Sequence, residues 1–447
     1  MPQHVDRRQF LRLGSAGALS LVVPSGASGS GVPVGVHSPS DSISLGLIGC
    51  GWRGGELLTN ALGTPGVRVI AVCDVDLVVA QRAAALTDQF YGNVTRSGRY
   101  RSCQAFQDFR LLLERSDLDA VLIATPDHWH AWISVAAVER GKDVYVEKPA
   151  SRSIPEGRAM VDAAARTGAV VQVGSQQRSM KYFQRLVELT RNDFLGEVKR
   201  VVVRLPQGLN IRGIVPPPPL APQTPPPGFD YNLWLGPAPE VPYYAERCHY
   251  NWHWCYDYGG GQVSNWIGHH YDIAAWATGL HTQFPVEILD AKAMFPVADP
   301  LFDTAKEYSF SVRYETGRVI EVLPESDDSS GASVRIEGTE GWCESSRSHV
   351  RTSSKVLERA SIPAGGFRCT STNHLANFLE CVRSRGVPAC PVSDGHRIAA
   401  VAHLANAAFR SGRSSVRFDP ASERIVDAPD ADALLTPPLR VPWTMPV

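Results

Sequence analysis

The sequence predicts an α/β protein built from two successive domains. From residue 43 to about residue 149, short apolar segments alternate with helical segments, as in a parallel sheet with helical crossovers. A glycine-rich turn follows the first apolar segment. Later segments alternate apolar and polar residues in the manner of antiparallel strands. We therefore expect an N-terminal Rossmann domain, followed by an α+β domain with a large open, mostly antiparallel sheet.

The elements of the first domain are expected in a regular order. Apolar strands are predicted at residues 44–48, 68–73, 120–123 and 143–146, with helices at 54–62, 77–87, 106–114 and 130–140 between and after them. A further helix at 160–167 leads to a strand at 170–173. The domain divisions are placed at residues 43–168 for the Rossmann domain, 169–420 for the second domain, and 421–447 for a tail that packs on the body of the protein.

The second domain begins with a helix at 182–191 and a strand at 197–205. A proline-dense stretch follows, from Pro216 to Gly228. Consecutive prolines cannot join a central strand, because each lacks a backbone N–H, so an exposed loop is expected there. Antiparallel strands are predicted at 286–293, 307–314, 318–322 and 333–337. The final helices, at 373–385 and 396–410, are expected to pack back on the body.

The first 42 residues are predicted to be a twin-arginine signal peptide and its linker. The segment from Asp6 to Arg12 reads DRRQFLR, and a modestly apolar stretch from Leu13 to Val23 follows. That stretch is too short and too rich in glycine for a stable membrane span. We expect recognition by the twin-arginine export machinery and a periplasmic or otherwise exported location. The alternative is a disordered N-terminus with a chance arginine pair.

Composition narrows the class of ligand. The formal net charge is −1 and no basic run interrupts the sequence, so nucleic-acid binding is not expected. The nine cysteines include no CxxC pair and no Cys/His spacing typical of a metal site. A small molecule is therefore the expected partner, with no disulfide framework and no metal.

A dinucleotide fingerprint follows the first strand, as Gly49-x-Gly51-x-x-Gly54. The first glycine allows a tight turn, the second lets backbone amides approach a pyrophosphate, and the third lets the helix pack close to the strand. Asp74 ends the next strand, where a carboxylate accepts the ribose hydroxyls and repels a 2′-phosphate. NAD is therefore preferred over NADP, although Arg53 keeps the phosphate form open. The expected cofactor contacts here are Gly49, Gly51, Trp52, Arg53, Gly54 and Asp74.

Two more motifs stand at the carboxyl ends of later strands, where open α/β sheets bind their ligands. They are ATPDHWH, from Ala124 to His130, and Glu147-Lys148-Pro149. A partly desolvated Lys148 is placed to shuttle a proton to or from a substrate hydroxyl or carbonyl. The other residues expected to line the cofactor are Thr125, Pro126, His128, Trp129, His130 and Glu147.

A third group of polar residues follows a triple glycine at residues 259–261. Residues 266–278 have a helical pattern, and Asn265 and His269 lie four apart on one helical face. An imidazole that faces Lys148 across a cleft forms a plausible proton-transfer pair. His269 is the stronger candidate and His270 the weaker one, and a structural role is the alternative for either.

These motifs, with GSQQRS at residues 174–179 and WLGPAP at 234–239, carry a family resemblance. The chain resembles the Gfo/Idh/MocA oxidoreductases over nearly everything after residue 43, and more narrowly their exported members. The resemblance implies that the second domain binds substrate and forms a homo-oligomer, a dimer or tetramer, through its open sheet. It also implies catalytic roles for Lys148 and His269, and contact of Gln176 with the nicotinamide ribose. Arg247, Tyr250 and Trp252 precede the triple glycine and are candidate contacts to sugar hydroxyls.

One departure from the family pattern concerns the position four residues before His269. Many sugar and inositol dehydrogenases of the family have an aspartate there, whereas this chain has Asn265. An amide cannot accept a proton, so either Lys148 and His269 suffice or the reaction differs from simple alcohol oxidation.

Three functions remain open at this point. The first is an NAD(P)-dependent oxidoreductase that acts on a sugar or polyol. The second is an exported glycosidase that retains NAD and oxidises its sugar transiently. The third is a non-catalytic sugar-binding protein.

Overall fold

The computed structural model describes residues 42–94, 102–213, 215, 221–297, 299, 301–325 and 331–444. Nearly all of the predicted export signal and the run Pro216–Pro219 lie outside these residues. Within the described part of the chain, no helix is long and apolar enough to cross a membrane.

The first sheet has six parallel strands in the order β3-β2-β1-β4-β5-β6, which is the doubly wound order of a Rossmann domain. The strands are β1 (Ile43–Ile48), β2 (Val67–Cys73), β3 (Gln104–Phe106), β4 (Ala120–Ile123), β5 (Asp143–Val146) and β6 (Val171–Val173). Because β6 pairs with β5, the division predicted at residue 168 cuts this sheet. The first domain continues at least to Val173.

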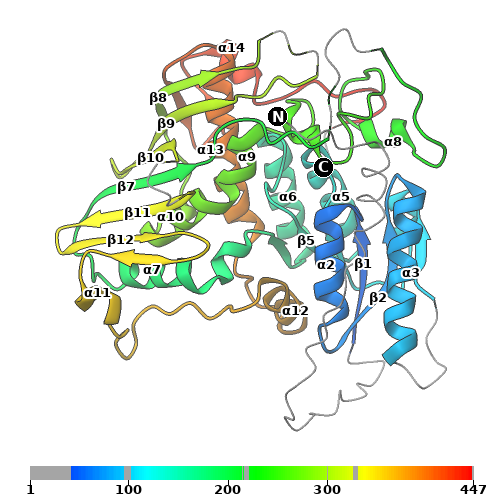
Figure 1. The fold of residues 1–447 in the computed structure, drawn as a ribbon, viewed down its shortest axis with the longest axis horizontal. Helices are drawn as coiled ribbons and strands as arrows, with labels where there is room; N and C mark the ends of the chain where they lie inside the picture. The colour runs from blue at the N-terminus through cyan, green and yellow to red at the C-terminus, as the bar shows by residue number, and fades with distance from the viewer. Residues whose placement is uncertain are drawn as a thin grey trace, which may run out of the picture. The chain divides into compact units, whose positions relative to one another are not determined.

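Helices α2 (Trp52–Leu62) and α3 (Leu77–Val94) flank β1 and β2 in Figure 1. The other helices of this part are α4 (Phe109–Leu113), α5 (His130–Val138) and α6 (Ile154–Thr167). Helix α6 begins six residues before the predicted start at residue 160. Ser153 caps it by accepting a hydrogen bond from the amide of Glu156, and Pro155 in its first turn is compatible with a helix start. The predicted helix at 106–114 is shorter because Phe106 belongs to β3.

The second sheet has nine strands in the order β13-β12-β11-β7-β10-β9-β8-β14-β15. They are β7 (Val198–Leu205), β8 (Glu287–Met294), β9 (Glu307–Arg313), β10 (Val319–Pro324), β11 (Ser333–Gly338), β12 (Gly341–Ser345), β13 (Val350–Thr352), β14 (Val416–Asp419) and β15 (Arg424–Ile425). Among the described strands of this sheet, only β7 and β10 pair in parallel. The expected open, mostly antiparallel sheet is confirmed.

One face of the second sheet is buried under helices (Figure 1). On β9, for example, Tyr308, Phe310 and Val312 are buried, whereas Ser309 and Ser311 on the other face are only half-buried. The covering helices include α7 (Lys181–Arg191), α10 (Asp272–Thr278) and α13 (Val392–Arg410). Helix α12 (His374–Ser384) packs instead on the Rossmann domain, where its Phe378 lies in the cluster that contains Leu45. Both late helices therefore return to the body.

The remaining helical elements are short. They are α8 (Tyr231–Leu235), α9 (Gly261–Trp266), α11 (Lys355–Arg359), α14 (Pro429–Ala433), the 3₁₀ turns η2 (Asp127–Trp129), η3 (Gln176–Ser179), η4 (Asn251–Trp254) and η6 (Leu280–Thr282), and the π-helical turn η5 (Ile267–Tyr271).

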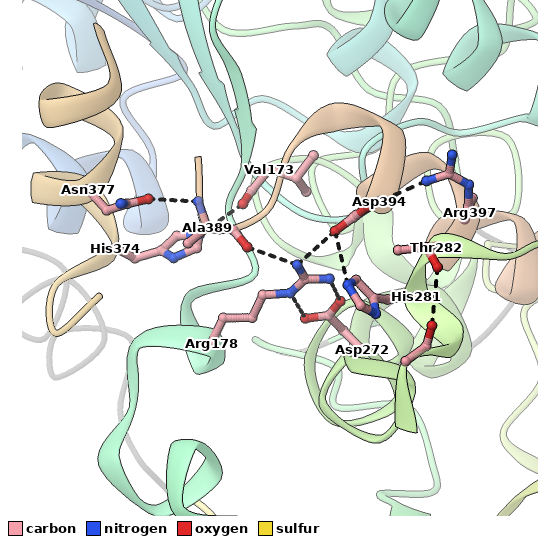
Figure 2. A network of polar contacts seen from close by, with 11 residues as sticks. Val173, Arg178, Asp272, His281, Thr282, His374, Asn377, Ala389, Asp394 and Arg397 are labelled. Atoms are coloured by element: carbon pink, nitrogen blue, oxygen red, sulfur yellow. Dashed lines mark hydrogen bonds and ion pairs between the residues drawn. The ribbon is translucent and has the colours of Figure 1, made fainter. Parts of the chain in front are cut away.

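A buried ionic network ties the end of the first sheet to the second domain (Figure 2). Arg178, in the turn after β6, donates from Nε and Nη2 to the two carboxylate oxygens of Asp272 at 2.8 and 2.6 Å. Its Nη1 donates to the Ala389 carbonyl and to Asp394. The Arg178 and Asp272 side chains are 1% and 0% exposed. Burial alone lowers the pKa of Arg178, but the Asp272 carboxylate holds it well above its usual value. The pair fixes η3 against the helix that follows His269.

Candidate active site

A cavity of about 810 Å³ lies at the carboxyl ends of the first sheet's strands. Both domains line it. The Rossmann domain contributes the glycine loop, Asp74, Lys148 and Gln176, and the second domain contributes Tyr250, Trp252, Asn265 and His269. The structure therefore brings together most of the residues that the three sequence motifs singled out.

The glycine loop fits a dinucleotide. Gly49 has a φ of 87°, and a Cβ there would lie 2.6 Å from the Ala124 carbonyl oxygen. A Cβ on Gly54 would lie 1.9 Å from the Gly49 oxygen, so this glycine allows the close approach of α2 rather than lining the cavity. A Cβ on Gly51 would meet nothing within 4 Å and would occupy the cavity itself. This opening, beside the start of α2, is where a pyrophosphate is held in such loops.

Asp74 is fixed at the end of β2. Its carboxylate accepts hydrogen bonds from the backbone amides of Cys50 at 2.8 Å and Asp76 at 2.9 Å. Burial raises the pKa of Asp74, and the two amides oppose that effect. The carboxylate borders the cavity and retains lone pairs for a ribose.

Arg53 does not point toward Asp74. Its Nε donates to Glu147 at 2.7 Å, one terminal nitrogen donates to Gln176 at 2.6 Å, and the other donates to Glu56 at 2.8 Å. Glu147 follows β5 and Gln176 follows β6, whereas Asp74 follows β2 on the other side of β1 in the sheet. The guanidinium is thus bonded to Glu147 and Gln176 on the other side of β1 from Asp74.

Lys148 reaches across the cavity to the second domain. Its Nζ donates to the Asn265 side-chain oxygen at 2.6 Å, and the Asn265 carbonyl lies at 3.4 Å. Burial lowers the pKa of Lys148, while the carboxylates of Glu147 and Asp127 oppose that effect. The amide partner orients the amine without adding a negative charge.

His269 lies in the π-helical turn η5 and borders the cavity. Its Nδ1 is buried and has no hydrogen-bond partner among the described residues. Burial, followed by the positive charges of Lys148 and Arg347, lowers the pKa of His269 well below its usual value. The neutral form of the imidazole is therefore favoured. The helix that carries it begins at Gly261, not at residue 266 as predicted, because Gly261 adopts a left-handed φ of 69° at the turn.

Three predicted contacts point away from the cavity. His128 packs against Trp234 and Tyr258, and its Nε2 bonds the Trp234 carbonyl at 3.0 Å. His270 is fully buried against Phe183 and Trp266. Arg247 donates to the Tyr231 hydroxyl and the Pro242 carbonyl inside an aromatic cluster. Trp129 beside His128 and His269 beside His270 border the cavity instead, and near Arg247 the bordering residue is His249.

His130 borders the cavity, but both its ring nitrogens bond backbone carbonyls, those of Pro149 at 2.7 Å and Thr125 at 3.0 Å. It joins the two strand-end motifs. Thr125, Pro126, Trp129 and Glu147 also line the cavity, as does Trp52 at the start of α2.

Sequence reasoning missed several residues that the structure places in the cavity wall. Asp127 is 4% exposed and burial raises its pKa to about 7. Arg212 stacks between Tyr250 and Trp52, with its guanidinium carbon 3.5 and 4.8 Å from the two ring centres. Trp266, His253 and Arg347 complete this side. Asp127 could have been predicted, since it lies inside the ATPDHWH motif. The loop residue Arg212 and the hairpin residue Arg347 carry no local sequence signal.

Comparison with known proteins agrees with the two domains. Residues 43–175 match the family model described as "Oxidoreductase family, NAD-binding Rossmann fold", and residues 180–445 match "Oxidoreductase family, C-terminal alpha/beta domain". A protein of Saccharopolyspora erythraea named "Glycosyl hydrolase family 109 protein" is 37% identical over 153 residues, which are 34% of this chain and 32% of that protein. The chain thus matches only about a third of the length of this curated relative.

Solved structures share the fold at low identity. The WlbA dehydrogenase of Bordetella pertussis, in complex with NADH and UDP-GlcNAcA, is 16% identical, with a TM-score of 0.60 over 85% of this chain and 99% of that one. A putative myo-inositol dehydrogenase of Sinorhizobium meliloti is 18% identical, with a TM-score of 0.56 over 84% of this chain and 99% of that one.

Proposed function

Because the chain belongs to the Gfo/Idh/MocA oxidoreductase family, we propose that it is an NAD(H)-dependent oxidoreductase that acts on a secondary alcohol or carbonyl of a sugar, polyol or glycoside. The observation that carries the proposal is the position of Lys148. Its amine borders the same cavity as the dinucleotide-type glycine loop, and it is held by Asn265 from the opposite domain. This position supports a role for Lys148 as the proton carrier between substrate and cofactor.

The chemistry needs one hydride and one proton. When bound, a nicotinamide dinucleotide accepts the hydride from the carbinol carbon, or returns it in the reverse direction. In the oxidising direction the O–H bond also breaks, and neutral Lys148 accepts that proton on Nζ. Its lowered pKa increases the fraction of neutral amine near neutral pH. Asn265 orients the amine by accepting a hydrogen bond, and neutral His269 offers a ring nitrogen to the substrate.

We propose NAD rather than NADP as the cofactor. Asp74 presents its carboxylate at the end of β2, where it favours a free ribose hydroxyl and repels a phosphate. Arg53, the residue that kept NADP open, is already bonded to Glu147, Gln176 and Glu56. Arg53 is therefore not free to pair with a 2′-phosphate beside Asp74.

The substrate class is supported by the aromatic side chains of the second domain. Tyr250, Trp252 and Trp266 line the cavity near polar groups, an arrangement suited to stacking and hydrogen bonding of a sugar. A location outside the cytoplasm, reached through the twin-arginine signal, and a dimer or tetramer formed through the open sheet belong to the same proposal.

A second candidate is redox-neutral glycoside cleavage, favoured by the name of the glycosyl hydrolase relatives. In such a cycle, transient oxidation of the sugar acidifies a neighbouring C–H bond, and the aglycone leaves after that proton is removed. Water then adds, and the hydride returns to the carbonyl carbon. The net reaction is hydrolysis and requires no free NAD.

The deciding experiment combines nucleotide analysis with turnover. The purified, extensively dialysed protein is denatured and the released nucleotide is identified by mass spectrometry. The protein is then incubated with a panel of sugars, polyols and aryl glycosides, with and without added NAD. NADH formation that depends on an alcohol substrate supports the oxidoreductase, and glycoside cleavage without added NAD supports the second candidate. A protein that binds sugars but neither NAD(H) nor NADP(H), and turns over no substrate, would contradict both and indicate a non-catalytic binder.

A further inference from the structure

Arg347 is a cation in the cavity wall that has no role in the chemistry described so far. Arg347 is at the tip of the hairpin formed by β12 and β13, at the edge of the nine-stranded sheet. The hairpin is closed by the amide of Ser346, which donates to the His349 carbonyl at 2.9 Å, and by the amide of His349, which donates to the Ser346 hydroxyl. Arg347 and Ser348 are therefore the two tip residues, and Arg347 borders the same cavity as Lys148 and His269.

The Arg347 side chain is held in place on one side only. Its guanidinium carbon lies 4.7 Å from the centre of the Trp266 ring. With the buried Gln177 amide oriented to satisfy both of its atoms, Gln177 accepts a hydrogen bond from Arg347 Nε at 2.8 Å and donates to the His269 carbonyl at 3.1 Å. Gln177 thus links Arg347 to the segment that carries His269. Within the described residues, neither terminal nitrogen of Arg347 donates a hydrogen bond to the protein, so both are available to a ligand in the cavity that this residue lines.

The absence of a counter-ion distinguishes Arg347 from Arg53 and Arg178, whereas Arg212 in the same wall likewise lacks a carboxylate partner among the described residues and lies over the Tyr250 and Trp52 rings. Arg53 is bonded to Glu147 and Glu56, and Arg178 is bonded to Asp272 and Asp394. Arg347 has no carboxylate partner in the part of the chain that the structure describes. Although Arg347 is exposed overall, the protein atoms around its guanidinium desolvate it, and this lowers its pKa. A partly desolvated cation is stabilised when an anion forms an ion pair with it.

The remaining charges do not supply that anion. Glu147 is bonded to Arg53, and Asp74 lies at the end of β2, where two backbone amides hold it. Asp127 acts electrostatically on Lys148, and the positive charges that lower the pKa of Asp127 are those of Lys148 and Arg152. A counter-ion for Arg347 would then have to be supplied by a molecule bound in the cavity.

We propose that the substrate carries an anionic oxygen group, such as the carboxylate of an acidic sugar, and that Arg347 binds this group while Lys148 faces the reacting hydroxyl. This inference rests on the proposed oxidoreductase function. A guanidinium edge with two free nitrogens matches a carboxylate in a bidentate manner, and such charge-assisted pairs are stronger than neutral hydrogen bonds. Trp266 then supports both the guanidinium and the sugar ring beside it.

The test compares sugars that differ only in the charged group. Binding of D-glucose, D-glucuronate, its methyl ester, glucose 6-phosphate and glucose 6-sulfate, and of the matching galactose series, is measured by calorimetry on the protein saturated with NADH. We expect at least one acidic sugar to bind about tenfold or more tightly than its neutral parent. Arg347→Gln should remove that difference and change binding of the neutral parent less than about twofold. Arg347→Lys should restore only part of it, because an ammonium lacks the fork.

Lys199→Gln is the matched control, since it removes one positive charge from an exposed strand position of the same domain. Thermal unfolding of all variants shows whether the hairpin substitution leaves the fold intact. The comparison among uronate, phosphate and sulfate identifies the anionic group. Equal binding of acidic and neutral sugars to the natural protein, or an equal loss of both in Arg347→Gln, would overturn the inference.

The outcomes separate this inference from the proposed function. NAD-dependent oxidation of neutral sugars alone would leave the oxidoreductase intact and reject the anionic substrate. Tight, Arg347-dependent binding of an acidic sugar with no hydride exchange in either direction would leave the anion site and reject the oxidoreductase.

Discussion

The two ends of the cavity treat charge in opposite ways. At the end formed around the glycine loop, Arg53 is bonded to two carboxylates and an amide. The Asp74 carboxylate there accepts hydrogen bonds from two backbone amides. At the end formed with the second domain, Lys148 bonds a neutral amide and His269 Nδ1 has no partner among the described residues. Arg347 there has no counter-ion in the same part of the chain.

The difference indicates what each end is built to meet. Paired groups are already held in position by the protein, which suits a cofactor that is the same whichever sugar is bound. Polar groups without protein partners are stabilised by a ligand that supplies a hydrogen bond or an ion pair. They discriminate strongly against ligands that lack such a group. Specificity is therefore expected to reside in the unpaired end.

The largest effect is expected at Lys148. Replacing Lys148 by Met removes the group that takes the hydroxyl proton and should reduce kcat for hydride transfer by about 10² to 10⁴-fold, the usual contribution of a positioned acid or base. NAD affinity, measured by calorimetry, should change little. Lys181→Met, at the exposed start of α7, is the control for loss of a lysine. Undiminished turnover on a confirmed substrate would remove Lys148 from the chemistry.

Arg178 and Arg347 test the contrast between paired and unpaired cations through stability. Arg178→Met leaves Asp272 buried without its partner and should lower the free energy of unfolding by about 3–5 kcal/mol. Arg347→Met removes a cation with no counter-ion among the described residues, but it also removes the donor to the buried Gln177, so it should cost only about 1–2 kcal/mol. Urea unfolding of both variants measures the difference. Similar losses in the two variants would mean that Arg347 supports the fold.

Asp74 tests the paired end. Asp74→Ser shortens the side chain and removes the carboxylate expected at the ribose, so NAD affinity should fall about tenfold or more. NADP affinity should fall less, because a repulsive charge disappears at the same time. Calorimetric titration with both nucleotides gives the ratio, and Asp117→Ser on the surface is the control. If the ratio of NAD to NADP affinity is unchanged, the ribose does not bind beside Asp74.

The smallest and most specific effect concerns Asn265. Asn265→Asp places a carboxylate at the atom that now lies 2.6 Å from Lys148 Nζ. An opposite charge favours the ammonium form, so the pKa of Lys148 should rise by about one unit or more. Oxidation needs the neutral amine, and its rate should therefore become half-maximal at a higher pH. Asn265→Ala, which adds no charge, should show no upward shift. If the pH–rate profile of Asn265→Asp is unchanged or shifts to lower pH, Lys148 is not the group whose titration controls the rate.

Local and periodic features were predictable from the sequence. The positions of the strands follow from apolar runs, and the glycine loop follows from steric requirements that act within a few residues. Lys148 could be placed near the cofactor because the carboxyl ends of parallel strands meet at one edge of a sheet. The third strand was missed, since β3 spans only three residues and has no buried run.

Side-chain direction and distant partners could not be predicted. His128 and His130 lie in one short motif, yet only His130 borders the cavity, because the 3₁₀ turn rotates each residue differently. Arg347 reaches His269 through Gln177, and these three residues come from separate elements of the fold. Such contacts depend on the packing of the second sheet, which no local pattern encodes.

The π-helical turn at residues 267–271 has a consequence for how this helix can vary. An extra residue in a helical turn shifts the angular phase of everything beyond it. Asn265 and His269 face the cavity before and within that turn, and Asp272 meets Arg178 directly after it. Removing one residue would straighten the helix and rotate one side by about 100° relative to the other. Either the side facing the cavity or the ion pair with Arg178 would then lose its register, so a deletion within this segment is expected to be more disruptive than a single substitution.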